Sequence, residues 1–234
     1  MTATVNIYGD SIMKGTVLTQ TLRYKATICE YLNRLCERFG LVAESRARFG
    51  MTVDKGAEIV EKDLSAGKNC TFALLEFGGN DCDYDWKAIS EDPAGIHEAK
   101  TPLPRFISLY AQMIEKIQAR GIVPLVMTLP PIDAQRYLDF LCRGENNERQ
   151  SIMYWLKDVQ RIYRTQERYS NAAARVAEAA GARLVDVRAH FLARDDLRGL
   201  LCCDGIHPSA EGYNLIYHIF ETYIEENGAF PCGA

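Results

Sequence analysis

The sequence predicts an α/β fold in which helices cover a parallel β-sheet. Short runs of β-branched and apolar residues alternate along the chain with longer segments in which apolar residues recur every three or four positions. The first pattern is typical of strands and the second of amphipathic helices. Glycines end many of these segments, as expected for strands and helices that stop at turns. We expect the whole chain, residues 1–234, to form one domain.

The first half of the chain contains three predicted strands and two predicted helices. The run 71–77, TFALLEF, is nearly all apolar, as a strand buried on both faces of a sheet should be. Other strand patterns precede it, and helical patterns that end near glycines separate them. The predicted strands cover 3–8, 41–47 and 71–77, and the predicted helices cover about 22–39 and 53–64.

The second half continues the alternation with two more strands and three helices. Pro208 and Ser209 are placed to open the last helix, where proline and serine are both common. Two segments without any period interrupt the pattern, and we expect them to be loop insertions at about 82–101 and 129–150. The predicted strands cover 122–128 and 182–187, and the predicted helices cover 106–117, 151–180 and about 208–224.

The composition argues against several classes of protein. The net charge is −4 and the two signs are mixed, so we expect no nucleic-acid partner. No apolar stretch reaches the roughly 18 residues of a membrane-spanning helix, and the first residues lack the regions of a signal peptide. The eight cysteines contain no C-x-x-C pair and the histidines are not spaced for zinc. We therefore expect reduced thiols, no metal, no membrane partner and a cytoplasmic location.

Polar residues and a glycine stand where the predicted strands end. Ser11 follows the first strand, Gly50 the second and Asn80 the third, and Asp204 and His207 come after the fifth. The carboxyl ends of parallel strands share one rim of the sheet, and ligands bind at that rim in open α/β sheets. We therefore expect these five residues, which are far apart in the sequence, to converge on one site.

These residue types suit nucleophilic catalysis. A serine hydroxyl needs a base to accept its proton, and His207 could serve Ser11 in this way. A carboxylate such as Asp204 would keep the imidazole in the required tautomer. The oxyanion formed during attack needs hydrogen-bond donors aimed at it. The candidates are the backbone N–H groups of Ser11 and Gly50 and the side-chain amide of Asn80.

Four sequence blocks, in this order, resemble those of the GDSL, or SGNH, hydrolase family. They are Y-G-D-S around Ser11, R-F-G-M around Gly50, F-G-G-N-D around Asn80, and D-G-I-H-P-S around Asp204 and His207. The resemblance implies a flavodoxin-like three-layer α/β/α fold with a five-stranded parallel sheet. It also implies ester hydrolysis through an acyl-enzyme, without metal or cofactor. Ser11 would be the nucleophile, His207 the base and Asp204 its partner, and Gly50 and Asn80 would join the Ser11 amide in the oxyanion hole.

Several positions near these blocks have more than one interpretation. The second block is less regular than in many relatives, so Gly56 is an alternative to Gly50. Asp10 is expected to hydrogen-bond the loops that hold the site, and it is also a candidate for substrate binding. Tyr84 and Trp86 stand beside aspartates in the first insertion. That composition suits substrate binding or a packed surface loop equally well.

The expected function is hydrolysis of a carboxylic ester, either a small acyl ester or an acetylated carbohydrate. Thioester or lysophospholipid hydrolysis and ligand binding without catalysis are the alternatives. The nucleophile lies in G-D-S-I-M rather than G-x-S-x-G, which disfavours an α/β-hydrolase. No glycine-rich phosphate loop follows the first strand, which disfavours a nucleotide binder. The expected partner is a small-molecule ester, and the sequence does not indicate the oligomeric state.

Overall fold

The core of the fold is a five-stranded sheet in which every neighbouring pair of strands is parallel. The computed structural model describes residues 2–19, 21–26, 29–144 and 147–227. The strand order is β4-β1-β5-β6-β7. The chain therefore passes from β1 to β4 on one side and then crosses to β5 on the other side of β1. Such a switch point at the carboxyl ends is where ligands bind in open α/β sheets. The strands are β1 (Ala3–Gly9), β4 (Leu41–Ser45), β5 (Phe72–Glu76), β6 (Val123–Met127) and β7 (Arg183–Val185).

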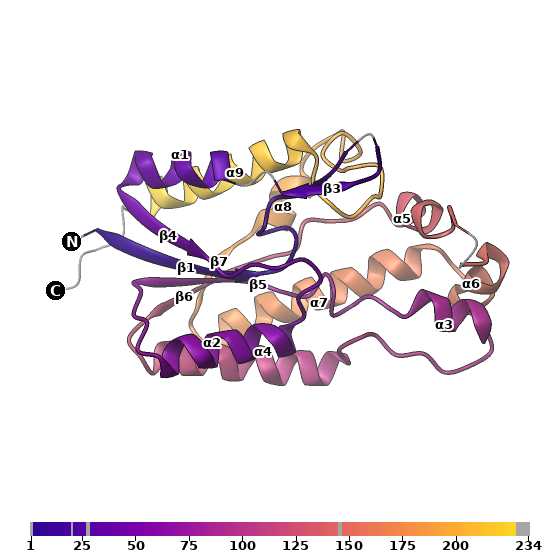
Figure 1. Ribbon diagram of the computed structural model, residues 1–234, viewed down its shortest axis with the longest axis horizontal. Helices are drawn as coiled ribbons and strands as arrows, with labels where there is room; N and C mark the ends of the chain where they lie inside the picture. Colours follow the sequence, from indigo (N-terminus) through magenta and orange to yellow (C-terminus); the bar gives the residue numbers. More distant parts are fainter. Residues whose placement is uncertain (1, 20, 27–28, 145–146, 228–234) are drawn as a thin grey trace.

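Helices cover both faces of the sheet, which confirms the predicted three-layer α/β/α architecture (Figure 1). On one face lie α1 (Cys29–Phe39), α8 (Val187–Leu192) and α9 (Ala210–Glu226). On the other lie α2 (Val53–Ser65), α4 (Leu103–Gln118) and α7 (Gln160–Ala179). An apolar core fills each of the two interfaces. All five residues of β5 are buried, as the apolar run at 71–77 predicts.

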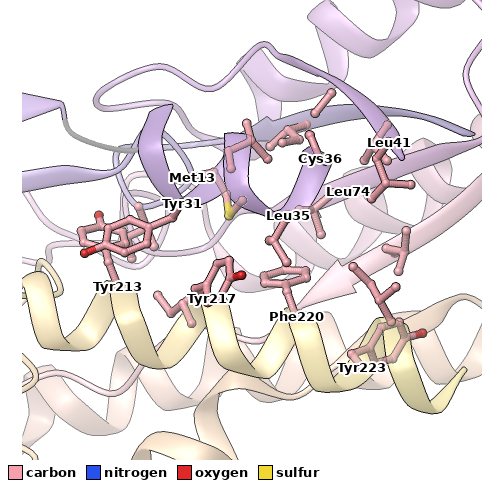
Figure 2. Close-up of a pocket in the computed structure, with 18 residues that line it drawn as sticks. Met13, Tyr31, Leu35, Cys36, Leu41, Leu74, Tyr213, Tyr217, Phe220 and Tyr223 are labelled. Atoms are coloured by element: carbon pink, nitrogen blue, oxygen red, sulfur yellow. The ribbon is translucent and has the colours of Figure 1, made fainter. Parts of the chain in front are cut away.

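An apolar cavity of about 100 Å³ lies between α1, α9 and the sheet. Figure 2 shows Met13, Leu35, Leu74 and Phe220 among the side chains around it. No charged residue is among those that line it. Catalysis needs convergent polar groups, so this cavity is part of the core between two layers rather than a reaction centre.

The segment before α1 differs from the prediction. The periodicity from Leu22 predicts a helix there, but β2 (Thr16–Leu18) and β3 (Tyr24–Ala26) pair as an antiparallel hairpin. Leu22 has a φ of 57°, in the left-handed region, and therefore lies in a turn. Strands of three residues are too short to show their period of two, which is why the sequence pattern misses them.

The helix predicted over 151–180 is two helices, α6 (Arg149–Leu156) and α7. Lys157 separates them with a φ of 63°. The next residue, Asp158, accepts the N–H of Gln160, the first residue of α7, at 2.9 Å. No glycine or proline marks the break, and the apolar period continues through it, so the sequence pattern predicts a single helix.

Both predicted insertions contain helices. The insertion at 82–101 holds α3 (Trp86–Glu91), and the insertion at 129–150 holds α5 (Ala134–Leu141) and the start of α6; its residues 145–146 lie outside the described residues. The three helices lie together at one end of the molecule (Figure 1). They share a third apolar cluster rich in aromatic rings, which makes them a packed wall rather than open loops. No helix in the described part of the chain is long and apolar enough to cross a membrane.

Candidate active site

The side chains of Ser11, His207 and Asp204 form one hydrogen-bonded chain. Ser11 Oγ lies 2.9 Å from His207 Nε2, and His207 Nδ1 lies 2.7 Å from Asp204 Oδ2. All three residues are buried, and Asp204 is fully so. The structure thus brings together three residues that the sequence separates by up to 196 positions. The order of atoms is the one that a serine nucleophile, its base and an orienting carboxylate require.

A tight turn after β1 presents Ser11. The carbonyl of Asp10 accepts the N–H of Lys14 at 3.1 Å, and Asp10 Oδ1 accepts the N–H of Ile12 at 2.8 Å. The second bond is an aspartate side-chain turn, which fixes the backbone on both sides of the serine. Because β1 ends at Gly9, the serine stands at the carboxyl end of a central strand, as expected.

A compact loop before α9 presents His207. The N–H of Cys202 donates to the carbonyl of His207 at 2.8 Å, which closes the loop on itself. Gly205 has a φ of 76°, and a Cβ there would lie only 2.6 Å from the carbonyl oxygen of Asp133. Only glycine fits both the conformation and the space. Ser209 caps α9 as the sequence predicts, since its side chain accepts the N–H of Gly212 at 3.2 Å.

Asp204 is held as an acceptor from several directions. Its Oδ1 accepts the N–H groups of Ile206 and His207, each at 3.1 Å, and its Oδ2 also accepts the hydroxyl of Tyr24 at 3.3 Å. Burial by itself raises the pKa of Asp204. The hydrogen bonds and charge of His207, with the two backbone donors, outweigh burial and hold the pKa below its ordinary value. The carboxyl group is therefore ionised beside the imidazole.

The three predicted oxyanion donors line the same cavity as His207. Among the described residues, the N–H groups of Ser11 and Gly50 donate to no protein acceptor. The Asn80 amide donates to Asp10 Oδ2 at 2.8 Å and to the carbonyl of Met51 at 3.2 Å. Two residues whose backbone donors have no partner and one residue with a fixed amide therefore line one cavity with His207.

The structure distinguishes the two glycines that the sequence left as alternatives. Gly50 lines the cavity, has a φ of 71° and has open space where a Cβ would stand. Gly56 is inside α2, where a Cβ would lie 2.3 Å from the ring of Phe77. Gly50 therefore has a position at the site, whereas Gly56 allows α2 to pack closely on the chain after β5.

The cavity that holds these groups has a volume of about 360 Å³, within the range of small-molecule sites. Tyr84 and Trp86, the aromatic candidates of the first insertion, both line it. Trp86 Nε1 donates to Asp83 Oδ1 at 2.7 Å, and the hydroxyl of Tyr137 donates to the same oxygen at 2.9 Å. Lys100 Nζ reaches the other oxygen, Oδ2, at 2.8 Å. The Asp83 carboxylate thus ties Trp86, Tyr137 and Lys100 together in this wall.

Asp10 and Asp81 are buried aspartates that hydrogen-bond to segments around the site. Asp10 also lines the cavity, but its two oxygens already accept the Ile12 N–H and the Asn80 amide. Asp81 is fully buried and accepts the hydroxyl of Thr101 at 2.7 Å and the N–H of Val53 at 2.9 Å. Both side chains therefore hold segments around the site in place.

Sequence reasoning missed the aromatic residues that surround His207. The ring of Tyr24 lies 4.9 Å from the imidazole, and the ring of Phe49 lies 6.1 Å away in a stacked orientation. Phe49 stands next to Gly50 in the second block, which was a usable signal. Tyr24 had none, because its place depends on the unpredicted hairpin.

No group of three or more His, Cys, Asp or Glu side chains that could hold a metal ion occurs in the described ranges. Six cysteines are free thiols, namely Cys36, Cys70, Cys82, Cys142, Cys202 and Cys203.

The sequence matches the GDSL-like Lipase/Acylhydrolase family over residues 7–215. Fold and match together define the class of protein, that of the acyl-ester hydrolases. The chain belongs to the GDSL-like lipase/acylhydrolase family, and the resemblance seen in its four blocks is confirmed.

Similar proteins agree with this membership. A GDSL esterase/lipase of Arabidopsis thaliana, CPRD49, is 24% identical over 175 residues, which are 73% of this chain and 61% of that protein. The chain thus spans about three fifths of the length of this relative. A lipase/acylhydrolase from Enterococcus faecalis has the same fold, with a TM-score of 0.67 and 18% identity over 99% of this chain and 100% of that one. A catalytic mutant of Axe2, an acetylxylan esterase from Geobacillus stearothermophilus, matches with a TM-score of 0.65 and 18% identity over 97% and 94% of the two chains.

Proposed function

We propose that the protein hydrolyses a carboxylic ester through an acyl-enzyme on Ser11. The observation that carries the proposal is the chain of contacts from Ser11 Oγ to His207 Nε2 at 2.9 Å and from His207 Nδ1 to Asp204 Oδ2 at 2.7 Å. These contacts give the hydroxyl a base and give the base a fixed tautomer. Family membership supports the same reaction class.

In the first half-reaction, Ser11 Oγ attacks the ester carbonyl while His207 Nε2 takes the hydroxyl proton. The ionised Asp204 stabilises the imidazolium that results. When the tetrahedral intermediate collapses, the bond to the leaving alcohol breaks and His207 returns the proton to that alcohol. In the second half-reaction, water replaces the serine as the nucleophile, and the same proton transfers release the acid and restore Ser11.

The negative oxygen of the intermediate would be bound by the N–H groups of Ser11 and Gly50 and by the Asn80 amide. The two backbone donors have no protein acceptor among the described residues, which supports this role. One amide hydrogen of Asn80 is committed to Asp10, and the other makes only the longer bond to Met51. This second hydrogen is the one that would be donated to the oxyanion.

The cavity wall supports a small ester with an apolar group on one side of the scissile bond. Asp83 is already bonded to three partners. Gln166 accepts from Arg188 at 2.8 Å and donates to the carbonyl of Pro130 at 2.8 Å. A carbohydrate would need free donors and acceptors on this wall. Aromatic and aliphatic side chains, among them Trp86, Ile132 and Phe140, form much of the remaining surface.

Turnover of p-nitrophenyl acetate tests the reaction. We expect Ser11→Ala to lower kcat by at least about 10⁴-fold, as loss of a serine nucleophile does elsewhere. Ser108→Ala, on the exposed face of α4, is the matched control and should behave as wild type. Equal rates for wild type and Ser11→Ala would rule out the serine mechanism, and a fluorophosphonate adduct on any other residue would do the same.

A substrate panel tests the preference. It contains aryl acetates and butyrates, acetylated xylose, a lysophospholipid and an acyl-thioester. Acetylated xylose belongs in the panel because a protein of the same fold is an acetylxylan esterase. We expect the aryl and alkyl esters to have the highest kcat/KM. A preference for acetylated xylose would show that the wall binds sugar hydroxyls despite its internal hydrogen bonds.

A further inference from the structure

Glu76 is a fully buried carboxyl group that the mechanism above does not use. It ends β5 and is the one charged residue in the apolar run 71–77. Its Oε2 accepts the N–H of Asp10 at 3.4 Å, whereas its Oε1 has no hydrogen-bond donor among the described residues. An ionised carboxylate with one bare oxygen is costly at such a position. A proton on the carboxyl group would remove that cost.

The groups around Glu76 also favour the protonated form. The carboxyl group of Asp10 is its nearest charged neighbour, since the Asp10 N–H donates to Glu76 Oε2, and two adjacent buried carboxyl groups are less costly if one of them carries a proton. The other titratable groups that face it are the carboxyl of Asp81 and the phenols of Tyr110 and Tyr213. None of these groups is cationic. Burial, and then the charge of Asp10, raises the pKa of Glu76 well above its ordinary value.

Asp10 connects Glu76 to the proposed oxyanion hole. Its Oδ1 accepts the Ile12 N–H and its Oδ2 accepts the Asn80 amide, each at 2.8 Å. The orientation of the Asn80 amide therefore depends on where the Asp10 carboxylate stands. Glu76, at the end of β5, accepts the backbone N–H of Asp10 and is not among the residues that line the cavity.

We propose that Glu76 is a positioning residue of the active site: as a neutral carboxylic acid it donates a hydrogen bond to Asp10 and thereby fixes the Asn80 amide for the oxyanion. The inference rests on the proposed function, because it requires Asn80 to bind the oxyanion. Glu76 itself touches no substrate and acts through Asp10 alone.

Infrared spectroscopy tests the protonation state directly. At neutral pH the wild-type protein should show the C=O band of a protonated carboxylic acid, and this band should be lost in Glu76→Gln. The matched control is Glu58→Gln, the same chemical change on the exposed surface of α2, which should not alter the band. A difference spectrum in which Glu76→Gln loses only carboxylate absorption would overturn the proposal.

Kinetics test the positioning role. Glu76→Leu removes the donor, and we expect kcat to fall about tenfold, less than for loss of an oxyanion donor itself, with KM nearly unchanged. Glu76→Gln keeps a donor for Asp10 and should restore most of kcat. In wild type, kcat should fall on the alkaline side as Glu76 ionises, because two adjacent carboxylates repel each other. Glu76→Gln should lack this limb.

A wild-type kcat in Glu76→Leu, or an identical alkaline limb in wild type and Glu76→Gln, would contradict the proposal. If Glu76→Leu does not fold, the spectrum and the pH profile of Glu76→Gln decide the question. Labelling of Ser11 by a fluorophosphonate separates this outcome from failure of the proposed function. If Ser11 is labelled but the Glu76 variants have the kcat of wild type, only the role of Glu76 is refuted. If turnover survives in Ser11→Ala, the serine mechanism itself is refuted.

Discussion

The hydroxyl of Tyr24 donates to Asp204 Oδ2 at 3.3 Å, and the same oxygen accepts His207 Nδ1 at 2.7 Å. A residue of the β2–β3 hairpin thus shares the acceptor that orients the His207 imidazole, and its ring lies 4.9 Å from that imidazole. The hairpin covers the serine–histidine–aspartate chain on the side of the cavity that Tyr24 and Phe49 line.

Replacement of Tyr24 should separate the effect of the hydroxyl from that of the ring. Tyr24→Phe removes one hydrogen bond, with an expected effect on transition-state stabilisation of about 1 kcal/mol, so kcat/KM should fall several-fold. Tyr24→Ala also removes the ring beside His207 and should cost more. Steady-state kinetics on an aryl acetate measure both. Equal losses in the two variants would show that the ring contributes nothing.

Asp204→Asn should lower kcat by about 10³- to 10⁴-fold while Ser11 and His207 stay in place, because the amide does not hold the required tautomer. Steady-state kinetics on an aryl acetate measure this loss.

Asp204 should also make stability depend on pH. The folded-state pKa of Asp204 is lowered, so its ionised form stabilises the fold above pH 3.8, and this contribution disappears as the pH falls through the folded value. The difference in Tm between wild type and Asp204→Asn should therefore be larger at pH 7 than at pH 3. A difference that is independent of pH would contradict the lowered pKa.

Asp81 should produce the opposite pH dependence. Burial raises the pKa of Asp81 from 3.8 to about 6, so the folded protein holds a proton that the unfolded chain has released between these values. Stability from this group is complete below pH 3.8 and is lost as the pH rises through about 6. Asp81→Asn keeps an acceptor for Thr101 and cannot ionise. Its Tm relative to wild type should rise between pH 4.5 and pH 8, and thermal unfolding at these two values checks the sign.

Gly50→Ala should lower both stability and activity, and Gly67→Ala should lower stability alone. The two glycines have φ of 71° and 69°, and neither has an atom within 4 Å of the position of a Cβ. The left-handed backbone therefore costs each alanine variant about 1 kcal/mol. Only Gly50 lines the cavity next to Ser11. Equal kcat values for the two variants would show that the backbone conformation at position 50 does not matter for catalysis.

Residues that belong to local patterns could be predicted from the sequence. The alternation of strand and helix periods indicates a parallel sheet, and the carboxyl ends of its strands bring Ser11, Asn80 and His207 to one rim. The four blocks around these positions identify the family before any contact is known. This part of the site is predictable because each block carries its own local conformation: a turn after β1, a glycine with positive φ, and a closed loop before α9.

Other features depend on contacts between distant segments. The hairpin with Tyr24 contains strands too short to show a period, and the break after α6 has no glycine or proline, so neither appears as a pattern. The charge of Glu76 within an apolar strand is visible in the sequence, but its partner Asp10 is 66 positions away. Hydrogen bonds of buried polar groups are settled by which segments meet in space, and only the tertiary structure decides that.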